Sequence, residues 1–190
     1  MIEAPVFEKG YPSYEAVNRK PAMKQRIGII YGSTTTNSER IAETIWDIFK
    51  ESELHDIKDG VGVIEQYEKV ILCAPTWDYG ALQEDYIDAW DDLTTVNWSN
   101  KTVALVGLGD QVGYPALYQD AMAKLYNMIE PLGAKCIGFT STKGHTFTKS
   151  DAVKDDKFVG LAIDEDCQRE LTEERLNTWI KQISFCWDKV

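Results

Sequence analysis

The amino-acid sequence predicts a doubly wound α/β fold, with a five-stranded parallel sheet that has helices on both faces. Short apolar runs rich in Ile, Val and Leu, such as 26–31 and 101–107, are typical of parallel strands buried on both faces. Between these runs, apolar residues recur at helical spacing, as they do over 38–50. Strand and helix patterns alternate five times along the chain, which indicates this fold class.

Turn-forming residues separate the predicted elements. The first strand stops at Gly32, the central strand stops at Pro75, and Pro131 follows the helix that the third loop leads into. Pro and Gly also interrupt residues 1–22, which we interpret as an extension ahead of one domain at 23–190. The predicted strands are 26–31, 54–57, 68–74, 101–107, 134–139 and 158–162, the predicted helices are 38–50, 86–93, 116–129 and 172–185, and a polar stretch covers 141–156.

Composition restricts the possible partners. The net charge is −11, from 20 basic and 31 acidic residues, so the chain repels nucleic acid and anionic membranes, and a basic protein is the favoured partner. No apolar run reaches the roughly 18–20 residues of a membrane helix, and the N-terminus lacks the features of a secretory signal. The two histidines stand alone and the cysteines are far apart, so we expect no metal site and a cytoplasmic protein with reduced thiols. The cysteines are Cys73, Cys136, Cys167 and Cys186.

Ligands of such sheets bind at the carboxyl ends of the strands, so the loops after the strands are candidate sites. The loop after the first strand carries five hydroxyl groups and one amide but no Lys or Arg. It leads into a helix N-terminus, where backbone N–H groups favour an anion, and it lacks the Walker A pattern. It predicts either a seat for a phosphate monoester or a helix cap followed by a polar turn. Its residues are Ser33, Thr34, Thr35, Thr36, Asn37 and Ser38.

Two further loops carry aromatic residues. Trp77 follows the central strand, and Gly80 gives that loop the backbone freedom for a tight turn against a ligand. The loop at 107–120 has a glycine pattern one residue longer than the dinucleotide fingerprint, and Asp110 would repel a pyrophosphate. Trp77 is either packed on a neighbouring loop or covers one face of a planar ligand, with an aromatic ring of 107–120 on the other. Two facing aromatic rings and a phosphate seat describe a site for flavin mononucleotide (FMN).

Four stretches of sequence match a known family. They read IGIIYGSTTTNSERIAETI, APTWDYGALQEDY, VALVGLGDQVGYPALYQDAM and KFVGLAIDEDCQRELTEERLNTWIKQI. In these motifs the chain resembles the flavodoxins, in particular their long-chain branch, from about Met23 to the C-terminus. The pattern Pro-Thr-Trp-Asp-Tyr-Gly with Gln-Glu-Asp soon after looks closest to the second flavodoxin of enteric bacteria. The resemblance implies that 141–156 is the insertion that interrupts the last strand in that branch.

The resemblance implies FMN as the cofactor. Trp77 would cover the inner face of the isoalloxazine, Tyr114 would stack on the outer face, and Asp166 would lie near the ribityl chain. The hydroxyl-rich loop would hold the phosphate. The implied cofactor-binding set is Ser33, Thr34, Thr35, Thr36, Asn37, Ser38, Pro75, Thr76, Trp77, Asp78, Tyr79, Gly80, Leu108, Gly109, Asp110, Tyr114, Tyr118, Gln119, Asp120 and Asp166.

Three residues depart from the family pattern. Family members often have Lys where Asn37 stands. They usually have Gly where Thr36 stands, and a β-branched residue resists a positive φ. We therefore expect the phosphate loop to adopt a different backbone. Leu117 replaces a commonly polar residue, which would remove one hydrogen bond to the flavin.

The resemblance implies a low-potential one-electron carrier, not an enzyme, that cycles between the neutral semiquinone and the anionic hydroquinone of FMN. Desolvation by the aromatic walls, together with Asp110 and the net charge, would disfavour the anionic form and lower its potential. The backbone carbonyl of Asp78 would accept a hydrogen bond from flavin N5 after a peptide flip.

An acidic segment follows the Trp77 loop. It predicts either a solvated helix face or a docking surface for a basic flavodoxin/ferredoxin NADP reductase-type protein and for downstream acceptors, with the chain as a monomer. Two alternatives are an FMN-dependent NAD(P)H:quinone reductase, for which the sequence shows no second pocket, and a flavin-free regulatory domain of the same fold. The acidic residues are Glu84, Asp85, Asp88, Asp91 and Asp92.

Overall fold

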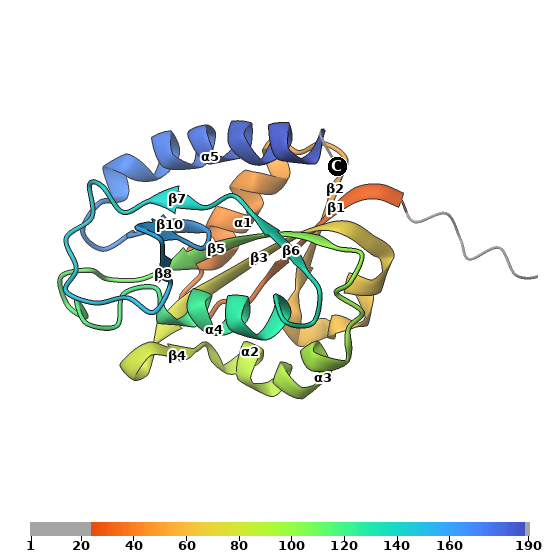
Figure 1. Ribbon diagram of the computed structural model, residues 1–190, viewed down its shortest axis with the longest axis horizontal. Coiled ribbons are helices and arrows are strands. Elements are labelled where there is room, and N and C mark those ends of the chain that lie inside the picture. Colours follow the sequence, from red (N-terminus) through yellow and green to blue (C-terminus); the bar gives the residue numbers. More distant parts are fainter. Residues whose placement is uncertain (1–23, 189–190) are drawn as a thin grey trace, which may run out of the picture.

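The structure of the protein, a computed structural model, describes residues 24–188, so the predicted extension at 1–22 lies outside the described residues. A parallel sheet in the order β10-β5-β3-β1-β2 forms the centre of the molecule, and β6 also pairs with β5 (Figure 1). All these pairs are parallel, which confirms the predicted fold class. The strands are β1 (Lys24–Tyr31), β2 (Ser52–Asp56), β3 (Tyr67–Trp77), β5 (Thr102–Leu108), β6 (Lys135–Ile137) and β10 (Leu161–Ile163), with β4 (Ala81–Leu82) antiparallel to β3.

Helices cover both faces of the sheet, as predicted (Figure 1). One face packs against α1 and α5, and the other packs against α2, α3 and α4. Within residues 24–188, none of the helices combines the length and apolar character needed to cross a bilayer. The helices are α1 (Asn37–Ile48), α2 (Glu84–Asp88), α3 (Trp90–Thr95), α4 (Asp120–Ile129) and α5 (Thr172–Trp187), with short 3-10 helices η2 (Ile57–Asp59), η3 (Val61–Gln66), η4 (Asp78–Gly80) and η5 (Arg169–Leu171).

The central strand β3 is buried on both faces, which explains its continuous apolar run. Val70 and Leu72 point toward the α4 side, whereas Ile71 and Cys73 point toward the α1 and α5 side, and all four are fully buried. Side chains of a strand alternate between the two faces, so a strand covered by helices on both sides needs apolar residues at every position.

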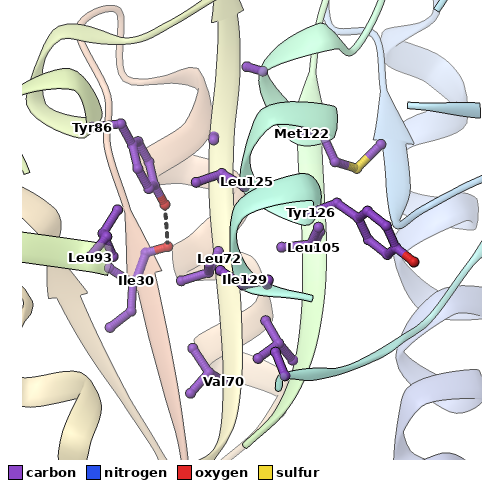
Figure 2. Packing of buried hydrophobic residues seen from close by; sticks show 14 of the residues in the cluster. Ile30, Val70, Leu72, Tyr86, Leu93, Leu105, Met122, Leu125, Tyr126 and Ile129 are labelled. Carbon is purple, nitrogen blue, oxygen red and sulfur yellow. Dashed lines mark hydrogen bonds between the residues drawn. The ribbon is translucent and has the colours of Figure 1, made fainter. Parts of the chain in front are cut away.

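Figure 2 shows the core on the α4 side of the sheet, where Leu72 of β3 lies close to Leu125 of α4. Tyr86 of α2 is fully buried in the same cluster. Its hydroxyl donates toward the backbone carbonyls of Ile30, at 3.3 Å, and Cys73, at 3.1 Å. This contact fixes α2 against the carboxyl-terminal parts of β1 and β3, where the loops of the predicted site begin.

Several predicted boundaries are wrong. The helix expected at 86–93 is divided at Ala89 into α2 and α3. The helix expected from 116 begins only at Asp120, because Gln119 adopts a left-handed φ of 67° and the chain before it forms turns. The central strand continues past Pro75 because its last two residues, ending at Trp77, pair with β4.

A small antiparallel sheet interrupts the last strand position of the main sheet. The two halves of that position are β6 and β10, which pair with successive parts of β5. The strand expected at 158–162 is divided between two sheets, because the chain leaves the small sheet after Phe158 and enters the main sheet at Leu161. Between them Gly160 lies so close to Leu105 that an added Cβ would be 2.4 Å from its carbonyl oxygen. The small sheet consists of β7 (Thr140–Ser141), β8 (Val153–Lys154) and β9 (Lys157–Phe158).

Candidate functional site

A cavity of about 440 Å³ lies at the carboxyl ends of β1, β3, β5 and β10. This is the edge where parallel sheets of this class bind ligands, and the volume suits a small molecule. Its lining comes from all three predicted loops and from the loop after β10. The lining residues are Thr35, Asn37, Pro75, Thr76, Trp77, Asp78, Tyr79, Gly80, Leu108, Gly109, Asp110, Tyr114, Leu117, Tyr118, Glu165 and Asp166.

The hydroxyl-rich loop ends at the N-terminus of α1. Within the described part of the chain, Ser33 Oγ and Ser38 Oγ are buried and have no hydrogen-bond partner. The N-cap residue Thr36 gives no side-chain cap, so the first backbone N–H groups of α1 also lack a side-chain acceptor there. Buried donors without partners are costly, and a helix N-terminus favours an anion. The loop therefore has the donor set of an anion seat.

Thr36 has φ 65° and ψ −5°, which is left-handed backbone. The expectation that a threonine would force a different backbone here is wrong. In this conformation the carbonyl of Thr36 accepts the first helical hydrogen bond, from Arg40 N at 2.9 Å. For a β-branched residue such a φ is strained by roughly 1–2 kcal/mol.

Trp77 and Tyr114 line the same cavity although they come from different loops. Trp77 ends β3 and is half-buried, while Tyr114 is 60% exposed. Directly after Trp77, the turn Asp78–Gly80 has left-handed backbone at Tyr79 (φ 48°) and at Gly80 (φ 81°). The sequence prediction that the two aromatic residues lie at one site is consistent with this arrangement.

The far end of the cavity is acidic. Burial alone would raise the pKa of Asp110, but the backbone N–H groups of Gly113 and Val112 donate to its carboxylate and bring the pKa below its usual value. Burial raises the pKa of Asp166, and the neighbouring carboxylates, Asp110 first, raise it further. Within the described chain, no Lys or Arg is among the lining residues. An anionic part of a ligand would therefore be repelled by the carboxylates at this end, which suits an uncharged part.

Comparison with known proteins identifies the family of the chain. The sequence pattern of the family described as Flavodoxin matches residues 29–179. The chain belongs to the flavodoxin family. It is 44% identical over 162 residues to the flavodoxin of Synechocystis sp., covering 83% of this chain and 95% of that protein. It is 43% identical to Flavodoxin 2 of Escherichia coli strain K12, covering 83% and 94%. The crystal structure of Fusobacterium nucleatum flavodoxin bound to flavin mononucleotide has a TM-score of 0.81 at 32% identity, covering 84% and 96%.

In this flavodoxin, part of the predicted set lies behind the cavity wall. Gln119 is fully buried and donates through Nε2 to the carbonyl of Ile163, at 3.0 Å. Asp120 is buried at the start of α4, where its carboxylate accepts from Asp151 N at 2.8 Å and burial raises its pKa. The left-handed φ of Gln119 turns both side chains away from the loop surface. The predicted residues outside the lining are Ser33, Thr34, Thr36, Ser38, Gln119 and Asp120.

Leu117 and Glu165 line the cavity but were not in the predicted set. Leu117 belongs to a loop that the sequence did single out. Glu165 follows β10, and a correct placement of that strand at Leu161–Ile163 would have marked the residues after it by the same carboxyl-end rule.

Tyr118 connects the cavity of this flavodoxin to the small antiparallel sheet. It lines the cavity but is almost fully buried, and its hydroxyl lies 3.0 Å from Nδ1 of His145. Its ring packs edge-on against Phe158, with the ring centroids 5.8 Å apart. Burial lowers the pKa of His145 to about 4, with a smaller contribution from Arg175. The insertion thus supports one wall of the cavity.

We expect that replacing Thr36 with glycine stabilises this flavodoxin by about 1 kcal/mol, because glycine adopts a positive φ without the Cβ clash. Urea unfolding of the flavin-free chain measures this change. Thr35→Gly is the matched control, because Thr35 is not among the described residues with positive φ. Glycine there relieves no strain and only increases the conformational freedom of the unfolded chain, which lowers stability. A Thr36→Gly protein that is no more stable than Thr35→Gly would contradict the strain assigned to Thr36.

Proposed function

We propose that this flavodoxin binds FMN and acts as a one-electron carrier, not as an enzyme. One observation carries the proposal: buried hydroxyls without partners, at Ser33 and Ser38, lie on the loop that continues into a cavity with Trp77 and Tyr114 in its lining. This combination fits a phosphate at one end and a flat ring system at the other. The flavodoxin from Fusobacterium nucleatum, solved with flavin mononucleotide, has the same fold at 32% identity.

The chain's own residues bind and orient the cofactor, and the flavin supplies the redox chemistry. The N-terminus of α1 and the hydroxyls of Ser33 and Ser38 hold the phosphate. Trp77 and Tyr114 exclude water from the two faces of the ring. The carbonyl of Asp78 accepts from Ala81 N–H within its turn, so rotation of the Asp78–Tyr79 peptide frees it for the flavin.

The charges around the cavity favour a low potential. The lining holds the carboxylates of Asp78, Asp110 and Asp166 and that of Glu165, which is paired with Arg40 and Arg169, and the whole chain has a net charge of −11. Negative charge near the ring opposes the addition of an electron, because the reduced ring then carries like charge in a partly desolvated site. One-electron cycling of this kind is typical of the family.

A paired binding measurement tests the FMN site. The double variant Ser33→Ala/Ser38→Ala should bind FMN about 100-fold more weakly, because each hydroxyl loses a hydrogen bond to a charged phosphate. Riboflavin lacks the phosphate, so its affinity should not change. The flavin-free double variant should unfold at the same urea concentration as the natural chain, or higher, because no existing hydrogen bond is removed.

Two outcomes would overturn this function, and a third would overturn the assignment of the phosphate to the hydroxyl-rich loop. Purified natural chain that stays colourless and does not bind added FMN would favour the flavin-free regulatory alternative. Rapid NADPH-dependent turnover of a quinone by the FMN-loaded chain would favour the quinone reductase alternative. Equal losses of FMN and riboflavin affinity in the double variant would show that the hydroxyl-rich loop does not bind the phosphate.

We further propose that the acidic segment 84–92 docks a basic reductase and downstream acceptors. Its acids lie on α2 and α3, two helices that follow the Trp77 turn on one face of the sheet. Glu84, Asp88, Asp91 and Asp92 are exposed, while Asp85 is half-buried and accepts from Gln83 Nε2 at 2.7 Å. The exposed acids support electrostatic steering, which affects association rate more than affinity.

Ionic strength tests this docking surface. Electron transfer from a basic flavodoxin reductase should slow as salt rises, since screening reduces steering. Asp88→Asn/Asp91→Asn should reduce both the rate at low salt and its salt dependence. The control Glu173→Gln/Glu174→Gln removes the same charge from α5 on the opposite face. Equal salt dependence in the two double variants would locate docking elsewhere.

We also propose a branch of the family, a cellular location and an oligomeric state for the protein. The small sheet between β6 and β10 supports membership of the long-chain branch, with an insertion close to the predicted 141–156. All four cysteines are free, which is consistent with a cytoplasmic location. A monomeric state, which size-exclusion chromatography measures, would suit a carrier that exchanges partners.

A further inference from the structure

We propose that Lys124 is a positioning residue that holds the Asp78–Gly80 turn against the flavin and thereby adjusts the reduction potential. The inference rests on the proposed function, because it concerns the same FMN site. Lys124 is not among the lining residues, and no sequence pattern assigned it a role. Its ammonium group, however, donates to the backbone carbonyl of Gly80, which lies on the cavity wall.

The turn has two fixed ends and one movable centre. Two residues before the turn, near the end of β3, Thr76 Oγ1 accepts from Ala121 N of α4, at 3.4 Å. At its end, the carbonyl of Gly80 is held by Lys124 of the same helix. Between these ends the carbonyl of Asp78 bonds only within the turn, to Ala81 N–H, so far as the described contacts show. The first turns of α4 therefore confine rotation to the Asp78–Tyr79 peptide.

Close packing supports the same assignment. An added Cβ at Gly80 would lie 3.0 Å from Asp120 Oδ2, so the turn touches α4 directly at this point. Asp120 and Lys124 are four residues apart and lie on the same side of the helix. Gly80 has a φ of 81°, which residues other than glycine rarely adopt. A larger residue at this position would therefore disturb both the backbone of the turn and its contact with α4.

Charge gives Lys124 a second influence on the site. The cavity lining holds four carboxylates and, within residues 24–188, no Lys or Arg. The ammonium of Lys124, which belongs to an exposed side chain, donates to the carbonyl of Gly80 and adds a positive charge to a wall whose acid Glu165 is already paired with Arg40 and Arg169. A nearby cation stabilises the form of the cofactor that carries an added electron. Removing the ammonium group should make reduction of the flavin less favourable. Losing its hydrogen bond to Gly80 should also change the equilibrium between the two orientations of the Asp78–Tyr79 peptide.

The test compares four FMN-loaded full-length proteins: the natural chain, Lys124→Met, Lys124→Arg and Lys181→Met. Lys181 is exposed on α5, and Lys181→Met removes the same charge far from the turn, so this variant is the matched control. One-electron reduction is titrated at fixed pH and ionic strength. We expect Lys124→Met to make one of the two reduction equilibria about tenfold less favourable, which is about 59 mV for one electron. Lys124→Arg keeps a cationic donor and should restore most of the difference, whereas Lys181→Met should stay close to the natural chain.

Each outcome is decisive. Potentials of Lys124→Met that equal those of Lys181→Met would overturn the proposal, and so would a loss of urea stability in Lys124→Met without any shift in potential, which shows a structural role only. A shift that Lys124→Arg does not reverse would overturn the role of the hydrogen bond. Failure of the natural chain to bind FMN would instead reject the proposed function, so the two failures are distinguishable.

Discussion

Replacing Asp164 with alanine is expected to destabilise the protein by about 3–5 kcal/mol and to weaken FMN binding at least tenfold. Asp164 follows β10 and is fully buried. One carboxylate oxygen accepts from Gln111 through its backbone N, at 3.0 Å, and its Nε2, at 2.8 Å. The other accepts from the backbone N of Asp166, at 3.1 Å, and of Cys167, at 2.8 Å.

This carboxylate joins the two loops that form the acidic end of the cavity. Gln111 follows Asp110 in the loop after β5, and Asp166 belongs to the loop after β10. Alanine leaves four donors without their acceptor, of which the two from Gln111 are buried while Asp166 and Cys167 are exposed, and each buried hydrogen bond to a charged group contributes about 1.5–3 kcal/mol. The loops should then separate, which explains why the loss extends to flavin affinity.

Thermal unfolding and FMN titration measure the two effects. A loss of 3–5 kcal/mol corresponds to a melting temperature lower by about 10 °C for a domain of this size. Asp164→Asn keeps the shape and one acceptor oxygen, so it should lie between the natural chain and Asp164→Ala. Asp47→Ala, on the exposed face of α1, is the control for loss of one negative charge. If Asp164→Ala had the same melting temperature as Asp47→Ala, the carboxylate of Asp164 would not be the link between the two loops.

Asp164 also illustrates what the sequence could not reveal. The pattern predicts the central strands, because burial on both faces requires apolar residues at every position, as in 70–73. The topology then predicts which loops meet at the site, so Trp77 could be placed with an aromatic ring of 107–120, and the resemblance to flavodoxins selected Tyr114 as that ring. Whether an acidic residue in such a loop points into the cavity or joins two loops behind it depends on tertiary packing, and periodicity carries no information on that.

The misplaced residues have the same physical origin. Gln119 and Asp120 lie in a loop that was correctly singled out, but one left-handed residue turns their side chains toward β10 and the insertion. Thr36 was expected to avoid a positive φ on its intrinsic preference, yet it adopts one at the start of α1. Single backbone conformations of this kind are set by the surrounding structure and override local propensity.

We expect the stability of the protein to fall by about 1–2 kcal/mol more in the natural chain than in His145→Gln when the pH is lowered from 7.5 to 5. Burial holds the pKa of His145 at about 4 in the folded state, against 6.5 for an ordinary histidine. Between these values the unfolded chain binds a proton that the folded chain does not, so stability is lost as the pH falls. A full shift of this size would contribute about 2 kcal/mol at pH 5, and partial exposure of the ring reduces it.

The charged groups that face His145 set the same direction. Arg175 of α5 disfavours a second positive charge beside it, while Asp164 partly offsets this effect. Glutamine cannot titrate, yet its amide oxygen can still accept from the hydroxyl of Tyr118, which His145 Nδ1 contacts at 3.0 Å. Urea unfolding of both proteins at the two pH values measures the difference, and Lys143→Gln controls for a charge change on the same loop. Because Tyr118 lines the cavity, FMN affinity should fall over the same pH range in the natural chain and less in His145→Gln. Parallel pH profiles of the two proteins would show that His145 is not the group responsible.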